Sequence, residues 1–193
     1  MAAEQGIRNM SEENIFDKLM EQYGQAAGES ISAMLNTKIE IKEPVTSEIL
    51  IKDVEYSILE PALFAKSCLT SNAAGTVVMI FRQRDMQAFL NKLMGSDDLP
   101  DPDFAFDEVA MSAAGELMNQ MVHSAAKSLA GYLENTMDFS DYQLFLSDSG
   151  QRLWEIMGED AAAKTTVIRY GMTIGDLLET EFLECISETA ADS

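Results

Sequence analysis

Basic residues are scarce in this sequence, and their scarcity argues against two classes of partner. The chain has 13 lysines and arginines against 33 aspartates and glutamates, which gives a formal net charge of −20. This charge would repel a nucleic-acid backbone, and it would also repel an anionic membrane surface. We therefore expect neither nucleic acid nor a membrane as a partner, whereas a basic protein surface would be attracted.

Cysteine and histidine are also rare. The two cysteines, Cys68 and Cys185, lie far apart in the sequence and form no disulfide framework, which favours a reduced protein in the cytoplasm. The single histidine, His123, has no second histidine or cysteine at ligand spacing, so we expect no metal site in this chain. Glycine-rich phosphate loops and the GxSxG and CxxC motifs are absent as well.

Long hydrophobic runs are missing too. No apolar stretch approaches the ~20 residues that a membrane-spanning helix needs. The N-terminal segment MAAEQGIRNMSEEN has no apolar core of the kind that signal peptides carry. With 47% hydrophobic residues, the composition is that of an ordinary globular protein. We expect a flexible leader over residues 1–10, one domain over residues 11–187, and a loose tail over residues 188–193.

Helical and strand patterns do occur, and they follow the same order twice. The first half shows capping residues in SEEN, a helix ending near Asn36, four strand-like segments (TKIEIKE, TSEILIKDV, ALFAKSCLTS and AGTVVMIFR) and a short helix, RDMQAFLNKLMG. After the connector SDDLPDPD, a second long helix is expected from about Asp107 to Leu133. The strand-like segment TMDFSDYQLFLSD, a short helix around QRLWEIMGED, and two more strands in TTVIRYGMTIGDLLETEFLECIS follow.

An offset of 98 residues superimposes the two halves. It places Met20 on Met118 and Ala27 on Ala125, and both copies run from a long helix into a strand. Amphipathic helices resemble one another by default, so two copies alone do not prove duplication. We predict two repeats, over about 11–95 and 107–187.

The second long helix carries a row of polar residues. Its apolar stripe comprises Met111, Ala114, Met118, Val122, Ala125, Leu129 and Tyr132. Ser112, Glu116, Asn119 and His123 cluster on a flank centred roughly 130° from that stripe. Such a flank is commonly just the solvated side of a helix. However, an asparagine is a weak helix former, and small neighbours such as Ala113 and Gly115 would let another protein approach closely. Both readings stay open on spacing alone.

The pattern Ser112-x3-Glu116-x2-Asn119 is similar to the signature helix of the CheC/CheX/FliY family of chemotaxis phosphatases. The run MSAAGELMNQMVHSAAKSL looks most like the second signature helix of FliY members of this family. The first helix and the following NTKIEIKEP, including Pro44, resemble the first repeat of the family. The resemblance extends from about Glu13 to Ile186.

This resemblance implies a CheC-like α+β fold with a pseudo-twofold repeat, in which an antiparallel β-sheet packs against two long helices. It also implies hydrolysis of the aspartyl phosphate on the chemotaxis response regulator CheY. Asn119 would orient the attacking water, and Glu116 would pair with a lysine of the regulator. Ser112 would support the interface and His123 would lie at its rim. The regulator supplies magnesium in this scheme, so no cofactor is expected in the chain itself.

The sequence also departs from the family pattern. In the 98-residue register, Asn119, Glu116 and Ser112 fall on Glu21, Lys18 and Asn14, so the first repeat has a degenerate site. The family usually has proline 23 positions after the asparagine, where this chain has Tyr142. We therefore expect one site rather than two.

Two alternatives remain beside the phosphatase. One is a non-catalytic scaffold or adaptor in the flagellar switch or chemoreceptor array, with a CheD-like protein or flagellar switch components as partners. The other is a binding module unrelated to chemotaxis. FliY proteins usually continue into a switch-ring domain, so the chain is either a lone phosphatase-like protein or a piece of a longer one.

Overall fold

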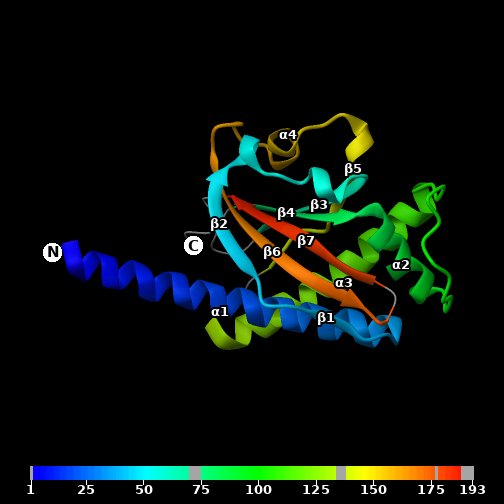
Figure 1. Ribbon diagram of the computed structural model, residues 1–193, viewed down its shortest axis with the longest axis horizontal. Coiled ribbons are helices and arrows are strands. Elements are labelled where there is room, and N and C mark those ends of the chain that lie inside the picture. The colour runs from blue at the N-terminus through cyan, green and yellow to red at the C-terminus, as the bar shows by residue number, and fades with distance from the viewer. Residues whose placement is uncertain (1, 70–74, 134–137, 177, 188–193) are drawn as a thin grey trace.

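The computed structural model describes the backbone of residues 2–69, 75–133, 138–176 and 178–187, and the side chains of these residues except 2–14 and 129–133 (Figure 1). The helices are α1 (Ala2–Leu35), α2 (Gln83–Leu93), α3 (Glu108–Leu133) and α4 (Leu153–Met157). The strands are β1 (Ile39–Ile41), β2 (Val45–Leu50), β3 (Ala62–Leu69), β4 (Gly75–Arg82), β5 (Gln143–Leu146), β6 (Lys164–Ile174) and β7 (Leu178–Ser187). The tail over residues 188–193 lies outside the described residues.

Helix α1 ends where the sequence predicts and begins earlier. Its last residue is Leu35, and Asn36 takes the left-handed conformation, with φ of 47°, that commonly terminates a helix. Its first residue is Ala2, so residues 2–10 are helical where a flexible leader was expected, and the capping residues of SEEN lie inside the helix. Alanine, glutamate and glutamine around positions 2–5 are good helix formers, which lets the helix continue through the segment.

The sheet confirms the antiparallel α+β architecture. Its seven strands run in the order β1-β6-β7-β4-β3-β5, with β2 also pairing with β6, and all pairs are antiparallel. The hairpins β3–β4 and β6–β7 meet at the central pair β4–β7. The strands after each long helix cross to the other half: β1 and β2 pair with β6, and β5 pairs with β3. The order is therefore symmetric about the β4–β7 pair.

Two strand predictions were too long. The segment TMDFSDYQLFLSD forms regular strand only over Gln143–Leu146, with an isolated bridge from Phe139 to Leu69. The segment TSEILIKDV turns from strand β2 into a 3₁₀ turn over Ile51–Asp53. Ile51 is buried against the far side of the sheet there, so tertiary burial overrides the β-branched pattern.

The two faces of the sheet have different covers. Helices α1 and α3 lie side by side across one face (Figure 1), and the repeat-related pairs Met20/Met118 and Ala27/Ala125 are all buried in that core. The opposite face is covered by α4 and by the 3₁₀ turns Ile51–Asp53 and Ser57–Leu59, whose buried residues belong to a second core cluster. Trp154 of α4 packs half-buried against this second cluster.

Glycine brings α1 close to the sheet. A Cβ added at Gly24 would lie 2.9 Å from Cε1 of Tyr170 and 3.1 Å from Cγ2 of Ile41. At Gly115 of α3, by contrast, an added Cβ would meet only Cδ1 of Leu144 at 3.9 Å, an ordinary contact. The two helical glycines therefore play different parts: Gly24 is required by packing and Gly115 is not.

Alanine at these two positions should act in opposite directions. We expect Gly24→Ala to lower the free energy of unfolding by about 1–3 kcal/mol, because the methyl group overpacks the core. Gly115→Ala should raise it by up to about 1 kcal/mol, because alanine favours the helix. Urea unfolding of both variants measures this difference, and equal shifts of the two midpoints would contradict the packing assigned to α1.

A carboxyl group is buried between the sheet and the helices. Glu184 of β7 is 3% exposed, and its Oε2 lies 3.4 Å from the hydroxyl of Tyr170, which is also 3.3 Å from the carbonyl oxygen of Met20. Burial raises the pKa of Glu184 from 4.5 to about 7, against the opposing effect of the Tyr170 hydroxyl. Glu184 also raises the pKa of the neighbouring phenols Tyr23 and Tyr142, in addition to the larger effect of their burial.

Stability should therefore fall as the pH rises through the range set by Glu184. Between about pH 4.5 and 7 the folded protein holds a proton that the unfolded chain releases, so the free energy of unfolding decreases by about 3 kcal/mol across this window. Glu184→Gln should remove this part of the pH dependence and be the more stable form at pH 8. Urea titrations at several pH values measure the effect, with Glu159→Gln on the surface as control. Parallel curves for wild type and Glu184→Gln would contradict it.

Candidate functional site on helix α3

Helix α3 begins at a side-chain cap. Oδ1 of Asp107 accepts a hydrogen bond from the backbone N–H of Ala110 at 2.9 Å, and the Asp107 carbonyl accepts from Met111 N–H. The helix therefore starts where the sequence predicts. Of the predicted apolar stripe, Ala114, Met118, Val122 and Ala125 are buried and Met111 is half-buried, whereas the side chains of Leu129 and Tyr132 lie outside the described residues.

The polar row lies on the outer flank of this helix. Ser112, Glu116 and His123 are exposed, and Asn119 is half-buried. Oε1 of Glu116 accepts a hydrogen bond of 2.6 Å from Nε2 of Gln120, one helical turn further on. Gln120 was not singled out from the sequence, although its spacing of four residues from Glu116 is the signal that would have found it.

Within the part of the chain that the structure describes, Asn119 is the one member of the row with a hydrogen bond to another segment. Its Oδ1 accepts a hydrogen bond of 2.9 Å from the backbone N–H of Tyr142. Within the described residues, no protein group accepts a hydrogen bond from its Nδ2. The sequence marked Tyr142 only as a departure from the family pattern; the structure connects it directly to Asn119.

The corresponding face of α1 carries different chemistry. Lys18 is exposed, and Glu21 is half-buried with its Oε1 accepting from Nε2 of Gln25 at 3.3 Å. Asn14 belongs to α1, and its side chain lies outside the described residues. The geometry thus places one glutamate–asparagine pair on α3 and a lysine–glutamate pair at the equivalent positions of α1.

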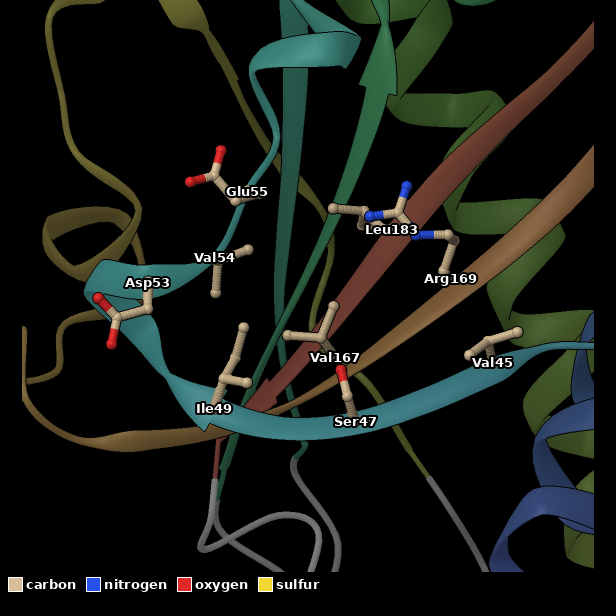
Figure 2. A pocket seen from close by; sticks show the side chains of 9 residues that line it. All are labelled: Val45, Ser47, Ile49, Asp53, Val54, Glu55, Val167, Arg169 and Leu183. Carbon is tan, nitrogen blue, oxygen red and sulfur yellow. The ribbon is translucent and has the colours of Figure 1, made fainter.

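A small pocket lies on the other face of the sheet. It has a volume of about 160 Å³ and is bounded by residues of β2 and by Asp53, Val54 and Glu55, over a floor of Val167, Arg169 and Leu183 (Figure 2). Nη1 of Arg169 is 3.0 Å from Oε1 of Glu181. Because α3 packs against the opposite face of the sheet, this pocket is separate from the polar row.

The described part of the chain contains no group of three or more histidine, cysteine, aspartate or glutamate side chains arranged to hold a metal ion. Among the described helices, none is both long and apolar enough to cross a membrane.

Comparison with known proteins bears on the fold. No family model matches the sequence. The chain is 24% identical over 165 residues to the flagellar motor switch phosphatase FliY of Bacillus subtilis (strain 168), a match that covers 84% of this chain and 42% of that protein. The chain therefore spans less than half the length of this curated relative.

Solved structures share the fold. Thermotoga maritima FliY superimposes with a TM-score of 0.81 at 22% identity, covering 94% of this chain and 92% of that one. A chain of the FliG–FliM complex from H. pylori gives 0.77 at 11% identity, covering 95% and 98%. The chemotaxis protein CheX from Desulfovibrio desulfuricans gives 0.56 at 13% identity, covering 88% and 97%.

The fold is a CheC-like α+β domain, and its second long helix carries the polar row on its outer flank. The sequence match and the shared fold support a CheC/FliY-like family for this chain.

Proposed function

We propose that the chain dephosphorylates the aspartyl phosphate of a chemotaxis response regulator, CheY or a protein like it, through one site formed by Glu116 and Asn119. The observation that carries the proposal is the position of this pair: both side chains lie on the accessible flank of α3, opposite the helix face that packs in the core. The name of the Bacillus subtilis relative, a motor switch phosphatase, supports the same activity.

The chemistry requires little from this chain. An aspartyl phosphate already hydrolyses in water, and the regulator that carries it supplies the magnesium ion and a lysine. What remains is to hold a water molecule in line with the bond that breaks. An amide suits this task, because it both donates and accepts hydrogen bonds and does not titrate. Asn119 presents an amide at the flank of α3, with Nδ2 turned away from its protein partner.

Glu116 has a binding role in this proposal. Its side chain is exposed, and the contact with Gln120 engages Oε1, so Oε2 is left to pair with a lysine of the regulator. Ser112 lies one turn earlier on the same flank and His123 one turn later than Asn119, and both would contact the regulator around the pair. The net charge of −20 favours approach to a basic patch.

Removing the Asn119 amide should abolish most of the acceleration of dephosphorylation. We expect Asn119→Ala to slow dephosphorylation by roughly 10²–10³, the usual cost of losing one placed hydrogen-bonding group. The lifetime of the phosphorylated regulator, followed with and without each variant, measures this loss. Glu21→Ala, at the equivalent position of α1, is the matched control and should behave as wild type. The activity is ruled out if wild type leaves the lifetime of the regulator unchanged.

Reversing the charge of the glutamate should affect binding more than the maximal rate. Glu116→Lys reproduces the residue that α1 carries at Lys18 and would repel the lysine of the regulator, so the half-saturating concentration should rise more than tenfold. Lys18→Glu is the matched control and should leave that concentration unchanged. If Lys18→Glu alters it as much as Glu116→Lys does, the regulator docks on both repeats and the single-site proposal is wrong.

A scaffold in the flagellar switch is the second candidate. The fold is nearer to a chain of the FliG–FliM complex, with a TM-score of 0.77, than to CheX, with 0.56. In this role the domain would bind switch components, or a CheD-like protein, without catalysis. Binding of the phosphorylated regulator with an unchanged phosphate lifetime would favour the scaffold over the phosphatase.

A further inference from the structure

We propose that the backbone N–H of Tyr142 is the positioning group of the α3 site, fixing the Asn119 amide in one orientation for catalysis. The inference rests on the proposed function for its catalytic meaning, but the contact itself is a property of this chain. The N–H of Tyr142 donates to Oδ1 of Asn119 at 2.9 Å across 23 residues of sequence. This contact is what distinguishes Asn119 from the exposed members of the polar row.

The donor is held by its neighbours on both sides. Before it, Ser140 is fastened to β3: its N–H donates to the Cys68 carbonyl at 2.9 Å, and its Oγ accepts from the Cys68 N–H at 3.0 Å. The hydroxyl of Ser67 donates to the Ser140 carbonyl at 2.6 Å. After it, Gln143 begins the β5–β3 pairing, opposite Lys66. Tyr142 therefore presents its N–H from a backbone that is bonded to β3 on both sides.

The ring of Tyr142 adds to this anchoring. The residue is 9% exposed, and its hydroxyl lies 3.9 Å from the sulfur of Met79 in the core under the helices. Burial of the ring and pairing of the backbone on either side fix both ends of the residue. The N–H direction is consequently set by the fold and not by the site.

An asparagine amide has two nearly equivalent orientations that exchange oxygen and nitrogen. An N–H donor selects one of them, because the Nδ2 hydrogens would collide with it in the other. With Oδ1 turned to Tyr142, its second lone pair is left to accept from a water molecule, and Nδ2 is left as a donor. Both functions of the amide are then available in one fixed arrangement, which is the condition for orienting a nucleophile efficiently.

The first repeat shows the opposite combination. The position equivalent to Tyr142 is Pro44, which has no N–H to donate. The position equivalent to Asn119 is Glu21, whose carboxylate accepts from Gln25 within its own helix. Because the family pattern also has proline at this position, the N–H donor is particular to the second repeat of this chain.

Hydrogen exchange tests the contact without reference to any activity. Within the described residues the Tyr142 N–H has no acceptor other than Asn119, so its exchange should be slow in wild type and at least tenfold faster in Asn119→Ala. Asn119→Asp keeps an acceptor oxygen and should keep the protection. The N–H of Ser140, bonded to β3, is the internal control and should be unaffected. Equal protection of Tyr142 in wild type and Asn119→Ala would overturn the proposal.

A matched pair of substitutions tests the catalytic consequence. Tyr142→Ala and Tyr142→Pro both delete the ring, but only proline deletes the N–H. With both variants shown by thermal melting to be folded, the maximal dephosphorylation rate of Tyr142→Pro should be about tenfold below that of Tyr142→Ala, at the same half-saturating concentration. Loss of packing alone would affect the two alike, so equal maximal rates would overturn the positioning role.

The two experiments separate the two proposals. Should wild type fail to accelerate dephosphorylation, the proposed function falls together with the catalytic role of Tyr142, and the exchange data still report whether the anchor exists. Should wild type be active while Asn119→Ala leaves the Tyr142 N–H protected, the function stands and the positioning role of Tyr142 is wrong. If Tyr142→Pro does not fold, the exchange comparison decides the proposal.

Discussion

The antiparallel pairing of β4 with β7 joins the two halves of this molecule, and the rest of the structure depends on it. Each of these strands is the inner member of a hairpin, so one interface, from Val77–Ile186 to Ile80–Leu183, unites β3–β4 with β6–β7 in a continuous sheet. Both faces of this sheet are apolar at its centre, which requires a cover on each side. Helices α1 and α3 cover one face, and α4 with the 3₁₀ turns covers the other (Figure 1).

This organisation also explains how the polar flank of α3 acquires a partner. The chain that leaves α3 does not pair with the hairpin of its own half but with β3 of the first half. Ser140 and Gln143 fasten that segment, and Tyr142 lies between them, facing Asn119. Asn119 is therefore bonded to a segment of the second repeat that is itself held by a strand of the first, so the site depends on both halves of the domain.

Much of the architecture could be predicted from the sequence. The periodic spacing of apolar residues predicted the long helices and the strands rich in β-branched residues, because this spacing reflects which side chains are buried. The start of α1 did not follow, since good helix formers continue past a segment that resembles a cap. The polar row and its degenerate counterpart at Lys18 and Glu21 were visible as well. The hydrogen bond from Tyr142 to Asn119 could not be predicted, because its donor is a backbone N–H, which every residue type except proline has. Likewise, nothing in the sequence around Glu184 indicates that tertiary packing buries its carboxyl group.

The pairing of strands from one half with the hairpin of the other has a consequence for how such a domain can evolve. The outer neighbours of the β6–β7 hairpin, β1 and β2, come from the first half, and the outer neighbour of the β3–β4 hairpin, β5, comes from the second half. Each hairpin therefore depends on strands of the other half. Deleting the first repeat would expose an edge of the second, so selection for folding retains it whether or not it carries chemistry. Residues on the outer flank of α1 are under no such demand. A domain built this way is free to change residues on the outer flank of α1, such as Lys18, while keeping every strand.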